Sequence, residues 1–304
     1  MALIQVLIAF NIIGSCSGMF LNMVIAVLSF RTSSKDAFWS PRDLLLFSIG
    51  LSSAVFGGFQ FFTNMTSYIW IEVFMTFNVC INFVNVVFIL TIFSSTCLTS
   101  LLCSFYCIKL VTFQHWFFTQ LRSVFPSLLP WMIAGTFVIS AVLLVALVGV
   151  ISLTAPLLDD GTMSNCPSIN ETYEEEVQAV MIGLNCMIAL PFLLIVVSLG
   201  VTFASLVLHV WKLQNSSSLD KSHIVAHIEA AKTMVLLLVL NVLFYLSNLL
   251  LNWNLVPRYS TLQTLCIMIY FFFWPLQALI LILRTKKLSL TLSSLLLPLK
   301  MVDT

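Results

Sequence analysis

Residues 73–108 read VFMTFNVCINFVNVVFILTIFSSTCLTSLLCSFYCI, a stretch without a single Asp, Glu, Lys or Arg. An α-helix needs about 20 apolar residues to cross the roughly 30 Å hydrocarbon core of a bilayer, and this stretch is longer. Its apolar residues do not alternate with polar ones as in the strands of a membrane barrel. We therefore predict a membrane-spanning helix, because lipid cannot satisfy the backbone polar groups of an open, irregular chain.

Six further stretches without charged residues flank this one, and each is long enough for a membrane crossing. They cover residues 1–30, 44–71, 123–158, 177–211, 233–257 and 259–283. The chain is 60% hydrophobic and 8% charged, whereas soluble domains contain about 25% charged residues. The sequence therefore predicts an all-α membrane protein, a bundle of seven transmembrane helices.

We expect a single receptor domain over residues 1–304 that ends in a short cytoplasmic tail, 285–304. The first charge-free stretch lacks the basic start and small-residue cleavage site of a removable signal peptide, so we interpret it as the first helix. The expected helices cover about 3–30, 44–68, 74–109, 125–153, 178–212, 230–254 and 260–284.

The basic residues predict the orientation of the chain in the membrane. Twelve of the thirteen Lys and Arg residues fall on one side of the expected bundle, and only Arg258 falls on the other. Cytoplasmic loops are enriched in Lys and Arg. We therefore expect a multi-pass plasma-membrane protein, surrounded by membrane lipids, with its N-terminus outside and its C-terminus in the cytoplasm. The net charge of +1 gives no indication of a nucleic-acid partner.

No Asp, Glu, Lys, Arg or His lies deep inside an expected helix. Ionisable residues in a membrane core usually mark proton relays, ion paths or counter-ions. Their absence argues against a retinal protein, a proton-coupled transporter, an intramembrane hydrolase and a receptor for charged amines. We expect no cofactor and no enzymatic activity. A small-molecule transporter is the rival class, but the odd helix number and the missing inverted repeat disfavour it.

Asparagines form one strip on the third expected helix. Asn78, Asn82 and Asn85 are spaced i, i+4 and i+7, which brings them to one face, and Phe88 and Ile89 continue inward. The strip is consistent with a cavity lining. It is equally consistent with amides that join helices, where each hydrogen bond contributes about 1 kcal/mol. Candidate ligand contacts are Gln60, Asn82, Asn85, Phe88, Ile89, Asn252 and Tyr270.

The expected outer loops contain two features typical of an extracellular surface. Asn170-Glu171-Thr172 is a glycosylation acceptor sequence in the longest outer loop. Cys80, near the outer end of the third helix, and Cys166, in the same long loop, are candidates for a disulfide, because the outer face is oxidising.

Motifs near the inner ends of the helices indicate a family. Residues 105–113 read FYCIKLVTF, similar to the Phe-Tyr-Phe-Leu-Lys-Ile-Ala-x-Phe of type 2 (bitter) taste receptors. In the third inner loop, 220–222, 226–228 and 231–234 read DKS, AHI and AKTM, where that family has Asp-Pro-Ser, Ala-His-Val and Leu-Lys-Thr-Met. The signatures of the rhodopsin-like group are missing. The chain thus resembles the type 2 taste receptors, a divergent group of G-protein-coupled receptors, over all but its fourth helix and outer loops.

The chain also departs from the pattern of that family. Ser53 stands in place of an arginine, Ile92 in place of a pocket asparagine and Phe88 in place of a tryptophan. Gln277-Ala278 replaces His-Ser, and Thr285 replaces a later asparagine. We therefore expect a divergent member whose ligands differ from those of better-known relatives.

The resemblance implies a chemosensory receptor for small, mostly neutral organic molecules of the bitter type. It also implies a heterotrimeric G protein with a gustducin-like α subunit and its β and γ subunits. Ordinary enrichment of basic residues at the inner interface would explain many of the candidate G-protein contacts equally well. A pheromone-type (vomeronasal type 1-like) receptor is the competing family. The candidate G-protein contacts are Lys109, His115, His209, Lys212, His227 and Lys232.

Overall fold

All of the regular structure in the described part of the chain is helical. The computed structural model describes residues 2–33, 39–69, 78–110, 116–154, 183, 186–205, 207, 221–252, 255–257, 260–285 and 288–290. The labelled helices are α1 (Ala2–Ser33), α2 (Pro41–Ile69), α4 (Asn78–Leu110), α5 (Trp116–Thr154), α8 (Lys221–Asn252) and α9 (Thr261–Arg284). With the helix over 186–205, seven helices in the described part of the chain are long and apolar enough to cross a membrane. The prediction of seven membrane-spanning helices is confirmed.

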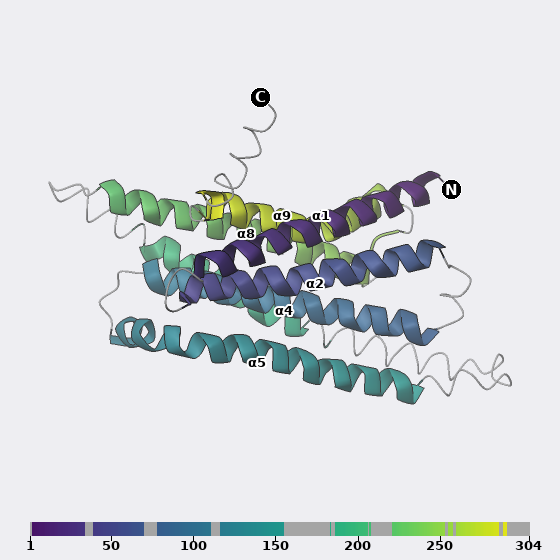
Figure 1. Ribbon diagram of the computed structural model, residues 1–304, viewed down its shortest axis with the longest axis horizontal. Helices are drawn as coiled ribbons and strands as arrows, with labels where there is room; N and C mark the ends of the chain where they lie inside the picture. The colour runs from purple at the N-terminus through teal and green to yellow at the C-terminus, as the bar shows by residue number, and fades with distance from the viewer. Residues whose placement is uncertain are drawn as a thin grey trace, which may run out of the picture.

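The helices lie side by side along one axis, and α4 lies between α2 and α5 (Figure 1). Most of its span Thr91–Lys109 is buried, so α4 is the interior helix. α4 packs against both α2 and α5, while α1 packs against α2 and α9, and α8 packs against α9. The helix over 186–205 contacts α8 through Phe192, whose ring stacks on Tyr245 with the ring centroids 5.3 Å apart. Large apolar side chains such as Trp131 on α5 (77% exposed) and Phe20 on α1 (66% exposed) cover the outside of the bundle. Such a surface fits lipid and not water.

Two helices begin earlier than the charge pattern predicts. α5 begins at Trp116 and not near residue 125, and α8 begins at Lys221 and not near residue 230. The charged residues mark the limit of the hydrocarbon region, but a helix can continue beyond it because its backbone hydrogen bonds are internal. Arg122, inside this extra part of α5, donates from Nε to the backbone oxygen of Ile108 at 3.3 Å.

Glycines allow α1 and α2 to approach backbone to backbone. A Cβ atom on Gly50 would lie 2.8 Å from the backbone oxygen of Asn22 and 2.9 Å from the nitrogen of Ala26. A Cβ atom on Gly57 would lie 2.9 Å from the nitrogen of Met19. Without a hydrophobic driving force in lipid, such close van der Waals packing is a main source of helix association.

Glycines also form the contact between α1 and α9, where α9 contains Pro275. Proline has no N–H to donate to the carbonyl four residues before it, which here is the carbonyl of Phe271. A Cβ atom on Gly14 would lie 3.0 Å from this oxygen, and one on Gly18 would lie 3.2 Å from the Pro275 Cδ. The small residues of α1 therefore accommodate the proline-containing segment of α9.

Serines connect the interior helix α4 to its neighbours. Ser94 Oγ lies 2.7 Å from Ser140 Oγ of α5. Ser104 Oγ lies 3.2 Å from Ser198 Oγ on the helix over 186–205. Around these contacts, one half of the bundle has an apolar core with fully buried leucines, among them Leu46, Leu98 and Leu102.

Candidate ligand site

A cluster of five aromatic side chains joins α2, α8 and α9 in the middle of the bundle. Phe244 of α8 lies at its centre, with its ring centroid 4.2 Å from Phe273, 5.4 Å from Tyr270 and 5.8 Å from Trp274. Phe56 of α2 lies 4.4 Å from Trp274. Rings at these tilted, edge-on and offset geometries attract each other beyond their hydrophobic burial. We call Phe56, Phe244, Tyr270, Phe273 and Trp274 the aromatic cluster.

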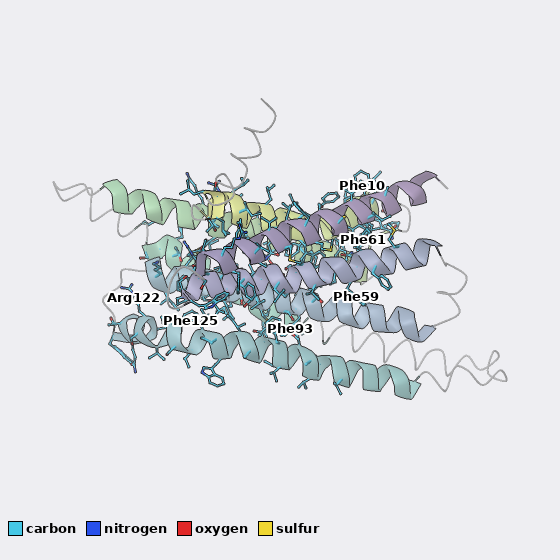
Figure 2. The ribbon with its side chains drawn as sticks, in the orientation of Figure 1. Phe10, Phe59, Phe61, Phe93, Arg122 and Phe125 are labelled. Carbon is cyan, nitrogen blue, oxygen red and sulfur yellow. The ribbon has the colours of Figure 1, made fainter. Side chains whose placement is uncertain are left out.

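Apolar side chains of two further helices complete the surroundings of the aromatic cluster. Ile92 and Phe93 of α4 (Phe93 is labelled in Figure 2) and Ile188 belong to the same buried group. Ile92 is 2% exposed, and it stands where the resembling family has an asparagine. Among the buried side chains of the described part, Asp43 is the one with a charge, and it lies thirteen residues before Phe56 on α2. This environment disfavours an unpaired charge, since burying one is costly.

Two of the predicted ligand contacts, Tyr270 and Gln60, have described side chains, and the two lie in different surroundings. Tyr270 belongs to the aromatic cluster and stacks on Phe244 with an interplanar angle of 11°. Gln60 is 8% exposed, and its Nε2 donates to the Oδ1 of Asn11 on α1 at 3.3 Å. Ser15 also donates to the Asn11 backbone oxygen at 2.8 Å. Gln60 thus joins α2 to α1, and a role in ligand binding remains a prediction.

The other predicted ligand contacts are described only through their backbone. Asn82, Asn85, Phe88 and Ile89 lie on α4 within about three turns before Ile92. Asn252 is the last residue of α8, about two turns after Phe244. Because α4 and α8 run in opposite directions, these positions lie at the same side of the aromatic cluster. Their side chains are outside the described part, so their role as ligand contacts stays a prediction.

A buried polar network links α4 to α9 next to the aromatic cluster. Gln277 is 1% exposed, and its Nε2 donates to Thr99 Oγ1 at 2.6 Å. Its Oε1 accepts a hydrogen bond from Ser95 Oγ at 3.4 Å. Thr99 donates in turn to the Ser95 backbone oxygen at 2.8 Å. Gln277 was singled out in the sequence only as a departure from the family pattern, and its partners were not predicted.

Residues at the other end of the bundle include two of the predicted G-protein contacts. Lys109, in the last turn of α4, is exposed, with Nζ 6.0 Å from the centre of the Phe105 ring. Lys232 of α8 is also exposed. Arg122 lies at this end, whereas Phe10, Phe59 and Phe61 lie in the opposite half of the bundle (Figure 2).

The same end contains polar contacts between helices. The side chain of Tyr106 on α4 lies close to Thr285, the C-cap residue of α9, and interacts with it. Asp43, near the start of α2, is 2% exposed, and its Oδ1 lies 3.3 Å from Arg42 Nη2. Arg42 and Asp43 both interact electrostatically with Tyr106, so the ends of α2, α4 and α9 lie close together.

Several predictions fall on residues outside the described part of the chain. His115, His209, Lys212, Asn170 and Cys166 are not described, and His227 and Cys80 are described only as backbone positions on α8 and α4. The G-protein contacts at the histidines, the glycosylation and the disulfide therefore remain predictions.

Sequence reasoning missed most of the aromatic cluster, because Phe56, Phe244, Phe273 and Trp274 were not singled out. A signal was present on α9, where Tyr270, Phe273, Trp274 and Gln277 follow the i, i+3, i+4, i+7 spacing of one helix face. In a chain with 26 phenylalanines, that spacing alone does not distinguish a cluster from residues facing lipid.

Comparisons with known proteins agree with this architecture. The family described as "Taste receptor protein (TAS2R)" matches residues 1–300. The chain is 25% identical over 287 residues to the taste receptor type 2 member 4 of Gorilla gorilla gorilla, covering 90% of this chain and 91% of that protein. It is 25% identical over 286 residues to the member 4 protein of Homo sapiens, with the same coverage. It is 25% identical over 218 residues to taste receptor type 2 member 41 of Mus musculus, covering 69% of this chain and 68% of that protein.

The family match extends over nearly the whole chain, and it agrees with the seven apolar helices. The members of this family are sensory receptors of the G-protein-coupled type and not enzymes. The chain is a multi-pass membrane protein that belongs to the type 2 (bitter) taste receptor family.

Proposed function

We propose that this chain is a bitter-type chemosensory receptor of the plasma membrane, with its N-terminus outside and its C-terminus in the cytoplasm. It binds small, mostly neutral organic molecules in the outer half of the helix bundle and activates a heterotrimeric G protein with a gustducin-like α subunit. The distribution of Lys and Arg supports the orientation. Membership of the taste receptor family favours this function over a pheromone receptor or a transporter.

The observation that carries the ligand proposal is the aromatic cluster. In the proposed orientation, its outer side is bordered by Tyr270 and by the backbone positions of Asn85 and Asn252. Pockets for small molecules are mostly apolar, with a few polar groups that fix the orientation of the ligand. The aromatic rings would supply the apolar surface, and the amide groups of Asn85 and Asn252 would supply the polar contacts.

Activation requires that the ligand binds the active arrangement more tightly than the resting one, because equal affinity for both shifts nothing. Trp274 contacts Phe56 and Phe244, and Gln277 is bonded to α4 about one turn further along the same helix. A ligand that moves the rings of α9 would therefore act on the contact between α4 and α9. The inner ends of α4 and α8, with Lys109 and Lys232, would then receive the G protein.

The test is a calcium assay in cells that express the full chain together with a promiscuous G protein, challenged with a broad panel of bitter compounds. Cells with an empty vector and measured surface expression are the controls. We expect a dose-dependent response to at least one neutral compound, which Asn85→Ala or Phe88→Ala weakens at unchanged surface expression.

No response to the panel, at confirmed surface expression, would contradict the proposed class of ligand. A response that occurs without the G protein would contradict signalling through a heterotrimer.

A further inference from the structure

Three helices meet at Asn22 of α1. Its Nδ2 donates to the Gly18 oxygen at 2.8 Å and to the Trp274 oxygen of α9 at 3.4 Å. Its own backbone oxygen faces Gly50 of α2. The Asn22 side chain is 1% exposed, and its Oδ1 has no hydrogen-bond partner among the described residues. An acceptor is therefore buried and unsatisfied where α1, α2 and α9 are in contact.

A second unsatisfied group lies on the facing side of α2. Ser53 is 0% exposed, and its Oγ has no hydrogen-bond partner among the residues that the structure describes. Its neighbours on α2 bond to their own helix, since Ser48 donates to the Leu44 oxygen at 2.9 Å and Ser52 to the Ile49 oxygen at 3.3 Å. The Ser53 hydroxyl does not follow this pattern.

Helix geometry brings Ser53 to the side of Asn22. Ser53 lies three residues after Gly50 and four before Gly57, so the three residues share one face of α2. Both glycines are packed against α1, Gly50 at Asn22 and Ala26 and Gly57 at Met19. Ser53 is thus on the α1-facing side of α2, at the level between these two contacts.

Buried polar groups without a partner are costly, and proteins commonly satisfy them with internal water. Asn22 Oδ1 can only accept, whereas Ser53 Oγ can donate and accept. A water molecule can donate one hydrogen bond to Asn22 Oδ1 and can either donate to Ser53 Oγ or accept from it. We propose that the junction of α1, α2 and α9 binds one structural water molecule, held by Asn22 Oδ1 and Ser53 Oγ.

The chemistry of the junction selects a neutral occupant over a metal cation. Asp43 is the acidic residue of α2 in the described part, and it lies ten residues before Ser53, about 15 Å along the helix. No carboxylate in the described part therefore neutralises a cation between Asn22 and Ser53. The bound water joins α1 to α2, and the Nδ2 of the same Asn22 donates to the backbone oxygen of Trp274, whose ring contacts Phe56 at 4.4 Å. It supports the position of the aromatic cluster.

The thermal stability of Ser53→Ala tests the proposal through the sign of its effect. If water satisfies Ser53, the substitution removes a hydrogen-bonded group and leaves the water poorly held, so the purified full chain melts roughly 2–4 °C lower. If the hydroxyl is unpaired, its removal leaves the melting temperature unchanged or raises it, and this overturns the proposal. Ser48→Ala is the matched control, because the hydroxyl lost there bonds only to its own helix. We expect a clearly smaller decrease for Ser48→Ala.

A second measurement keeps the proposal testable if Ser53→Ala does not fold. A high-resolution cryo-electron microscopy map of the unmodified chain is expected to contain density about 2.7–3.2 Å from both Asn22 Oδ1 and Ser53 Oγ. A map that resolves ordered water elsewhere in the bundle but no density at this junction overturns the proposal.

Discussion

Single glycine residues determine how closely the helices of this bundle approach one another. A Cβ atom on Gly50 would meet the backbone of α1 at 2.8 Å, whereas a Cβ atom on Gly135 of α5 would have nothing within 4 Å. The first position allows two backbones to touch, and the second is open. The two glycines therefore form a matched pair in which the same substitution has opposite consequences.

We expect Gly50→Ala to lower the thermal stability of the purified receptor. Overpacking costs about 1–3 kcal/mol, which exceeds the roughly 1 kcal/mol that alanine gains over glycine in a helix. Gly135→Ala gains the helix propensity of alanine without any overpacking, so it should leave the melting temperature unchanged or raise it. Equal effects of the two substitutions would contradict the close contact of α1 and α2.

The contacts of individual side chains could not be predicted from the sequence. Gln60 and Tyr270 could be identified from the sequence as polar groups in helices, but the side chains that surround each of them could not. The structure pairs Gln60 with Asn11 and stacks Tyr270 on Phe244. Both contacts join residues far apart in the chain, and neither leaves a trace in local spacing.

Among the described residues, α4 makes polar contacts with α5, with α9 and with the helix over 186–205, and the contact with α9 is the most buried of them. Gln277 contributes a donor to Thr99 and an acceptor to Ser95. Two interhelical hydrogen bonds in a membrane protein contribute about 1–2 kcal/mol together. This network is therefore the main polar link between the two helices in the described part of the chain.

Gln277→Leu should lower the melting temperature because Ser95 and Thr99 lose their partner on α9. Leu276→Met on the adjacent, 42% exposed position is the control and should have little effect. The measurement is thermal unfolding of both variants in the same detergent. A Gln277→Leu protein as stable as the unmodified chain would show that the network contributes nothing.

A double-mutant cycle tests the contact at the other end of α4 and α9. Tyr106→Phe and Thr285→Val each remove one of the two hydroxyl groups that interact between α4 and the C-cap of α9. We expect the double variant to be less destabilised than the sum of the single ones, by about 0.5–1.5 kcal/mol, the contribution of one hydrogen bond. Additive effects would mean that the two residues act independently.

The membrane-spanning helices could be predicted from the sequence, but their ends could not. Charge-free stretches identify the segments that cross lipid, because any unpaired charge there is costly. The extra turns of α5 after Trp116 and of α8 after Lys221 contain charged residues, so a search for charge-free stretches does not detect them. Their helical state depends on backbone hydrogen bonds and neighbouring contacts such as Arg122 to Ile108.

For the whole molecule, the positive-inside distribution of Lys and Arg predicts that the loop with Asn170 is extracellular. The chain expressed in mammalian cells should therefore carry an N-linked glycan at Asn170. Glycosidase treatment should reduce the apparent mass of the unmodified chain and leave Asn170→Gln unchanged. A glycan-free chain whose N-terminal tag is accessible only after permeabilisation would contradict the orientation.

The family and the seven-helix architecture could be predicted because they depend on composition and on short motifs near the helix ends. The candidate site depends on how helices distant in sequence are packed, so only Tyr270 of the aromatic cluster was predicted. The divergence seen at Ser53, Ile92 and Gln277 has a structural counterpart, since all three residues are buried in the interior of the bundle.

The central claim is that small neutral ligands act through the aromatic cluster. The most direct test measures the potency of one agonist in the calcium assay for Phe244→Leu and Tyr270→Leu, with Phe203→Leu, a 64% exposed position on the helix over 186–205, as control. We expect both cluster variants to raise the half-maximal concentration about tenfold, which corresponds to about 1.4 kcal/mol, and the control to leave it unchanged. Unchanged potency of both cluster variants at equal surface expression would contradict the claim.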